Sequence, residues 1–125
     1  MGQWSVRTED RDDVHDLFLD LCRVNNGNDR NKPELTRANA PAISKMLTSL
    51  VLHDNNLLPV AGICLMFIRL RLGTFLPSTL LKVTVLRLRI ELLNTRQHAT
   101  PSKRDKQVLG EIKSVTSLIS RKLPA

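Results

Sequence analysis

Apolar side chains recur at the spacing of one α-helical face in three separate segments of this 125-residue chain. Repetition at i, i+3, i+4 and i+7 is typical of a helix that buries one face and exposes the other. The pattern predicts helices over residues 8–25, 41–52 and 102–122. Their stripes are Val14, Leu17, Phe18 and Leu21, then Ile43, Met46, Leu47, Leu50 and Val51, then Val108, Leu109, Ile112, Val115 and Ile119.

Signals that begin and end helices support these segments. Thr8 is a candidate N-cap before a run of acidic residues, and Pro41 suits a first helical turn. Ser102 and Asp105 have the spacing of an N-cap and the third residue of its helix. Asn and Gly residues follow the first helix, where they favour its end. The stretches expected to be least structured are 1–7, 25–40 and 95–101.

The middle of the chain fits two interpretations. Pro59 and Pro77 suit the starts of two further helices. Apolar residues nevertheless alternate strictly with charged ones over residues 68–72 and 86–92, which is typical of a half-buried strand. We favour helices, because the flanking segments are helical, and the alternative of strands stays open for residues 79–93.

Length and composition favour one folded domain. A domain typically has about 100–150 residues, and 42% of this chain is hydrophobic. The predicted fold class is all-α: a small single-domain bundle of four to six short helices over residues 1–125, with residues 1–7 as a flexible tail. The alternative is an α+β fold with a β-hairpin within residues 63–92.

Charge is divided unevenly along the chain. Residues 1–34 carry eight acidic and five basic side chains, residues 35–125 carry four acidic and fourteen basic ones, and the net charge is +7. Such an excess suits a polyanionic partner or the chain's own acidic segment. Candidate contacts to a nucleic-acid backbone are Arg69, Arg71, Arg87, Arg89, Lys103, Arg104 and Lys106. The first four form one patch on a hairpin, whereas on helices they lie at the edges of an apolar core.

An acidic stripe runs beside the apolar face of the first predicted helix. Asp12, Asp16 and Asp20 recur every four residues, which places them on one side of a helix. We interpret the stripe as a solvated face. The alternative is that it docks on the basic part of the chain and masks it until a partner displaces the helix.

No arrangement of residues typical of an enzyme or of a metal site occurs. The glycines are scattered singly, and the three histidines do not have metal-ligand spacings. Cys22 and Cys64 lie far apart in apolar segments, where we expect buried free thiols. We therefore expect no enzymatic activity, no cofactor and no bound metal.

The chain begins without a basic leader followed by an apolar stretch, so secretion is not expected. Its longest apolar run, residues 57–68, is shorter than the roughly 20 residues that span a bilayer. We expect no transmembrane segment and a cytoplasmic or nuclear location.

These observations favour a non-enzymatic, basic, helical protein that acts as a regulatory or adaptor module through protein–protein contacts, alone or as a homo-oligomer. The predicted contact surface consists of leucines that flank turns and are expected to stay partly exposed, namely Leu57, Leu58, Leu76, Leu80 and Leu81. The main alternative is an RNA- or DNA-binding protein that contacts the phosphate backbone, although aromatic residues for base stacking make up only 3%. Peripheral contact with an anionic membrane is less favoured. The composition also suits a small viral accessory protein.

Overall fold

The computed structural model describes residues 7–26, 34–53, 57–95 and 103–122. Within these ranges it contains five α-helices, two short 3₁₀ turns and no strand. The all-α prediction is confirmed, and the alternative of a β-hairpin within residues 63–92 is wrong. The elements are η1 (Thr8–Asp10), α1 (Asp12–Asn26), α2 (Ala40–His53), α3 (Leu58–Arg69), η2 (Gly73–Phe75), α4 (Ser78–Thr95) and α5 (Lys103–Lys122).

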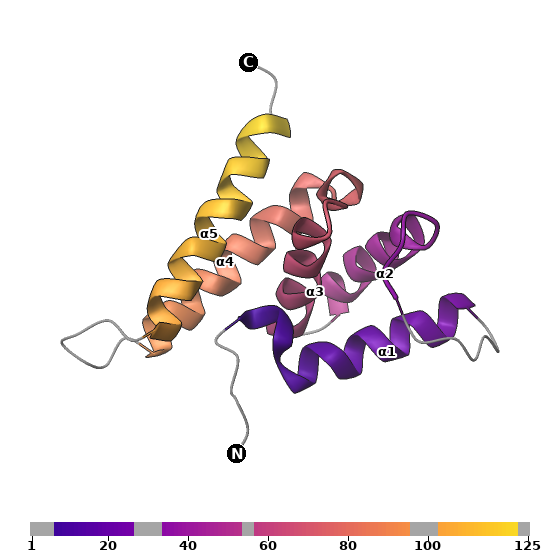
Figure 1. The fold of residues 1–125 in the computed structure, drawn as a ribbon, viewed down its shortest axis with the longest axis horizontal. Helices are drawn as coiled ribbons and strands as arrows, with labels where there is room; N and C mark the ends of the chain where they lie inside the picture. The colour runs from indigo at the N-terminus through magenta and orange to yellow at the C-terminus, as the bar shows by residue number, and fades with distance from the viewer. Residues whose placement is uncertain (1–6, 27–33, 54–56, 96–102, 123–125) are drawn as a thin grey trace.

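Helix α3 lies at the centre of the fold (Figure 1). All ten residues from Leu58 to Phe67 are buried, because this helix is apolar on every side rather than along one stripe. Helices α1 and α2 pack against it on one side, and α4, which is paired with α5, packs on the other. The turn η1 also packs on α3, so the acidic N-terminal part of the described chain lies close to α4 and α5.

The prolines of the middle segment stand at helix starts, as predicted. Pro59 lies in the first turn of α3, where its missing N–H group costs no hydrogen bond. Pro77 directly precedes α4, and its carbonyl oxygen accepts hydrogen bonds from the N–H groups of Leu80 (3.1 Å) and Leu81 (3.3 Å). Both prolines therefore favour helix over strand in the stretch that the sequence left open.

The start of the first helix differs from the prediction. Thr8 begins η1, and α1 starts only at Asp12, after Arg11 in an extended conformation. The Thr8 hydroxyl donates a hydrogen bond to Oε1 of Glu111 (2.7 Å). The predicted N-cap at Thr8 is therefore wrong, because this side chain is used in a long-range contact.

The connection before α2 is better defined than expected. The Thr36 N–H donates to Oδ1 of Asn39 (2.8 Å), and the Asn39 N–H donates to Oγ1 of Thr36 (3.3 Å). This reciprocal pair stabilises the turn that leads into α2, and Leu35 joins the core. Residues 34–39 form loop and turn, in agreement with the expectation of little regular structure over 25–40, whereas Asn25, Asn26 and Ala40 are helical and correct it. The predictions for Ser102 and for 1–6, 27–33 and 96–102 lie outside the described residues.

Helix α3 ends in a Schellman motif that has arginine at an unusual place. The Leu72 N–H donates to the carbonyl of Phe67 (2.7 Å), and the Arg71 N–H donates to that of Ile68 (3.1 Å). The motif requires a left-handed residue, and Arg71 has φ of 63°. Glycine usually occupies this position, because a side chain there costs about 1–2 kcal/mol. The favourable effect of a cation at a helix C-terminus, about 0.3–1 kcal/mol, does not outweigh that cost.

Cys22 and Cys64 are buried free thiols, as predicted. Burial raises the pKa of Cys64 from 9.0 to about 12, although a hydrogen bond with Thr84 lowers it somewhat. The folded protein therefore holds this proton more tightly than the unfolded chain does. The resulting stability is fully present below pH 9.0 and is lost between pH 9.0 and about 12.

This linkage predicts a measurable pH dependence. Above pH 9.0 the free energy of unfolding should fall because of Cys64, with a slope that reaches about 1.4 kcal/mol per pH unit between pH 10 and 11. Urea titrations at several pH values measure the slope, and Cys64→Ala is the control because it removes the thiol. An equal slope in the wild type and in this variant would contradict the prediction.

Candidate functional site

The four arginines of the predicted patch do not share a face. Arg69 ends α3, and Arg71 lies in the turn that follows. Arg87 and Arg89 are two residues apart on α4, so their side chains leave the helix about 200° apart. Arg87 is partly buried, whereas Arg89 is exposed. The single arginine face on which the nucleic-acid interpretation depended is therefore not formed by these residues.

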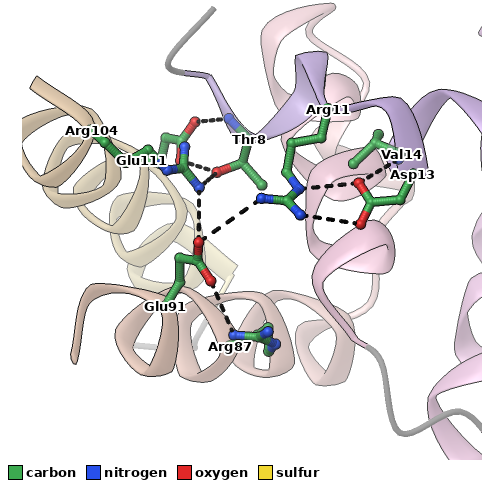
Figure 2. A network of polar contacts seen from close by, with 8 residues as sticks. All are labelled: Thr8, Arg11, Asp13, Val14, Arg87, Glu91, Arg104 and Glu111. Atoms are coloured by element: carbon green, nitrogen blue, oxygen red, sulfur yellow. Dashed lines mark hydrogen bonds and ion pairs between the residues drawn. The ribbon is translucent and has the colours of Figure 1, made fainter. Parts of the chain in front are cut away.

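Glu91 on α4 brings three arginines together at the junction of η1, α4 and α5 (Figure 2). Its Oε1 lies 4.0 Å from Nη1 of Arg11 and 4.0 Å from Nη2 of Arg104, and its Oε2 lies 3.7 Å from Nη1 of Arg87. That Arg87 atom is buried and has no hydrogen-bond partner among the described residues, so its contact with Glu91 is an ion pair only. One carboxylate thus neutralises cations from three parts of the fold.

Glu111 on α5 provides a second carboxylate in the same region. It accepts hydrogen bonds from the Thr8 N–H (3.0 Å), the Thr8 hydroxyl (2.7 Å) and Nε2 of Gln107 (3.3 Å), and it lies 3.9 Å from Nη1 of Arg104. Arg104 also donates from Nη2 to the Thr8 hydroxyl (2.8 Å). A buried charge is costly unless it is paired, and these contacts pair it. The cluster therefore fastens η1 to α5.

Ion pairs within the chain reduce the cationic surface. Arg69 pairs with Glu9 of η1, so Arg69, Arg87 and Arg104 all face carboxylates of this chain. Any external phosphate would have to compete with those carboxylates. The other candidates are exposed but lie on separate elements: Arg71 after α3, Arg89 on α4, and Lys103 and Lys106 at the start of α5.

The acidic segment touches the basic part of the chain through η1 rather than through the aspartate stripe. Glu9 of η1 and Arg11, which directly follows η1, make the ion pairs described above, whereas Asp12, Asp16 and Asp20 are exposed on α1. The ion pair that Asp20 makes with the described residues is local, with Arg23 (3.8 Å). The exposure of the aspartates agrees with a solvated face.

The leucines predicted as a contact surface belong to the core instead. Leu58, Leu76, Leu80 and Leu81 are buried, and Leu57 is half-buried. The expectation that they stay exposed is wrong for the four buried residues. Their turns lie against the central helix α3 or at its ends, so residues beside a turn are enclosed by neighbouring helices.

Helix α4 carries two apolar stripes on opposite sides. Leu81, Val85, Leu88 and Leu92 are buried and form part of the core. Leu86, Ile90 and Leu93 are 59%, 43% and 72% exposed, and they fall within about 60° of one another around the helix. This outer stripe, defined by Leu86, Ile90 and Leu93, is a contiguous apolar surface that the described part of the chain leaves uncovered. In the sequence it is hidden by the alternation of apolar and charged residues over 86–92.

Two cations flank the outer stripe on one side. Lys82 and Arg89 are exposed and project from α4 within about 60° of Leu86. Glu91, the acidic residue of α4, projects to the opposite side and is turned into the polar cluster of Figure 2. The stripe is therefore bordered by positive charge.

No group of three or more His, Cys, Asp or Glu residues among the described residues is arranged to hold a metal ion. None of the helices in the described parts of the chain is long and apolar enough to cross a membrane.

Comparisons of the chain with models of known protein families, with curated proteins and with solved structures found no match.

Proposed function

We propose that this chain is a non-catalytic protein-binding module of the regulatory or adaptor kind, whose contact surface is the outer stripe of α4. The observation that carries the proposal is the exposure of Leu86, Ile90 and Leu93 along one side of a helix whose opposite side already supplies the core. Single exposed leucines are ordinary on protein surfaces, whereas contiguous apolar surface often marks an interaction site.

The energetics of burial support this assignment. Removing a large aliphatic side chain fully from water contributes about 1.5–3 kcal/mol. Three such residues at i, i+4 and i+7 match the anchors by which one helix packs on another. A partner that covers the stripe can therefore gain affinity without any rearrangement of α4.

The flanking charges favour a particular partner, namely an amphipathic helix whose apolar face is bordered by acidic residues. Lys82 and Arg89 attract such a helix and disfavour one with basic borders. A second copy of this chain fits less well. In an antiparallel two-fold contact the cationic flanks of both copies lie on the same side, so like charges meet.

The proposal predicts a specific loss of binding. Leu93→Glu should weaken binding of an acidic amphipathic helical peptide about tenfold, because it places a charge in the apolar contact. Leu52→Glu is the matched control, since Leu52 is 77% exposed on α2 and Leu93 is 72% exposed on α4. Fluorescence anisotropy of the labelled peptide gives both dissociation constants.

The same titration separates protein binding from nucleic-acid binding. A peptide with lysines in place of its acidic residues should bind more weakly than the acidic one, and an RNA or DNA duplex should bind no more tightly than the acidic peptide at near-physiological salt. Equal losses in Leu93→Glu and Leu52→Glu, or tight duplex binding with a steep salt dependence, would contradict the proposal.

A further inference from the structure

A surface cavity of about 470 Å³ lies between the end of α3, the turn η2 and the C-terminal half of α5. It takes no residue from α4 and is therefore distinct from the outer stripe. A volume of this size is within the range of small-molecule sites. Its walls are Ile68, Arg71, Gly73, Thr74, Ser114, Ser117, Leu118 and Arg121.

The chemistry of these walls is cationic and rich in hydroxyl groups. Arg71 and Arg121 provide two guanidinium groups, and Thr74 and Ser117 provide hydroxyls. The Ser114 hydroxyl also lines the cavity but donates its proton to the carbonyl oxygen of Gly110 (3.1 Å). Among the described residues, no carboxylate lines the cavity and neither arginine makes an ion pair. This separates the two from Arg69, Arg87 and Arg104, which face carboxylates. Guanidinium groups and hydroxyls together match the oxygens of a phosphate group.

The backbone at Arg71 is an independent observation in the same place. Arg71 occupies the left-handed position of the Schellman motif, where glycine is the ordinary residue and a side chain is unfavourable. A residue that makes the fold less stable than glycine would at the same position is expected to be one whose side chain serves a function. Here that side chain lines the cavity.

The rim of the cavity is held in place by neighbouring contacts. Nζ of Lys122, at the end of α5, donates to the carbonyl oxygens of Thr74 (3.3 Å) and Leu76. A Cβ atom on Gly73 would lie 2.7 Å from Cδ2 of Leu118, so glycine permits the close approach of η2 to α5. Together with Ile68, Leu118 supplies apolar surface beside the arginines.

We propose that this cavity binds a small phosphate monoester that carries an apolar group. The phosphate lies between Arg71 and Arg121 and accepts hydrogen bonds from the hydroxyls of Thr74 and Ser117, while the apolar group rests on Ile68 and Leu118. Two guanidinium groups favour a dianionic phosphate over a singly charged carboxylate. The site is independent of the protein-docking role of α4.

Phenyl phosphate, inorganic phosphate and phenol are suitable probes, each titrated into the ¹⁵N-labelled full chain at low salt. Phenyl phosphate should bind most tightly of the three and should shift the amide signals of Gly73, Thr74, Ser114 and Ser117. Arg71→Gly and Arg121→Gln should each weaken its binding about tenfold or more. Arg37→Gln is the control, because Arg37 is an exposed arginine outside both the cavity and the outer stripe.

A second readout shows whether Arg71 is retained at the expense of stability. Arg71→Gly should raise the midpoint of thermal unfolding by about 2–4 °C, since glycine adopts the left-handed conformation freely. The proposal is overturned if Arg71→Gly and Arg121→Gln bind phenyl phosphate as tightly as the wild type, if Arg37→Gln loses as much affinity as they do, or if the shifts spread over the basic surface. A lower unfolding midpoint for Arg71→Gly would overturn the argument from backbone strain.

Discussion

Replacing Glu111 with alanine is expected to lower the free energy of unfolding by about 3 kcal/mol, the largest effect predicted for a single substitution in this chain. The side chain is only 6% exposed and accepts hydrogen bonds from the backbone and the hydroxyl of Thr8. Without it, these donors and Arg104 lose an acceptor in a poorly hydrated site. The expected loss of stability is at the low end of the range for breaking a buried ion pair, because Arg104 still has Glu91 as a partner at 4.0 Å.

Two further variants make this prediction specific. Glu111→Gln keeps the size of the side chain and one oxygen acceptor, so it should cost about 1 kcal/mol. Glu34→Ala removes an exposed glutamate and should change stability by less than about 0.5 kcal/mol. Urea unfolding followed by circular dichroism measures all three. A loss for Glu111→Ala no larger than that for Glu34→Ala would show that the cluster does not fasten η1 to α5.

Replacing Gly62 with alanine is expected to destabilise the fold by about 2 kcal/mol, although alanine is the better helix former. A Cβ atom at this position would lie 2.3 Å from Cγ2 of Val14 and 3.2 Å from the carbonyl oxygen of Thr8. Both neighbours would have to move, so α1 and η1 would be displaced from α3. The effect therefore measures how closely the N-terminal elements pack on the central helix.

Gly110 supplies the matched control for this substitution. A Cβ atom there meets nothing within 4 Å, and the residue is exposed within α5. Gly110→Ala should therefore raise stability by about 0.5–1 kcal/mol. In a Val14→Ala background the cost of Gly62→Ala should shrink, because the clashing γ carbons are gone. If Gly62→Ala lowers the free energy of unfolding by the same amount in the wild type and in the Val14→Ala background, a direct clash with Val14 is contradicted.

The sequence allowed the helices outside the middle to be predicted because each has one apolar stripe. Helix α4 was ambiguous for a specific physical reason. Leu88 and Leu92 face the core while Leu86 and Ile90 face outwards, so two helical stripes interleave at even-numbered positions. Alternation over residues 86–92 therefore mimics a strand. When the same alternating pattern is placed on a helix, its outward-facing apolar residues belong to the outer stripe.

The polar cluster and the buried leucines were beyond sequence reasoning for a different reason. Thr8 and Glu111 are separated by 103 residues, and no local pattern pairs them. Leu76 and Leu80 flank turns, as surface residues commonly do, yet neighbouring helices enclose them. Both outcomes depend on how the helices pack around α3, which periodicity along the chain does not specify.

The most direct test of the docking proposal is a map of where an acidic amphipathic peptide binds. Amide chemical-shift changes in the ¹⁵N-labelled chain should be largest at Leu86, Arg89, Ile90 and Leu93, and they should weaken when Lys82 and Arg89 are both replaced by glutamate. Lys45→Glu, on the exposed side of α2, should leave them unchanged. Changes centred on α1 or on the start of α5, or the same map in both charge variants, would contradict the assignment of α4 as the contact surface.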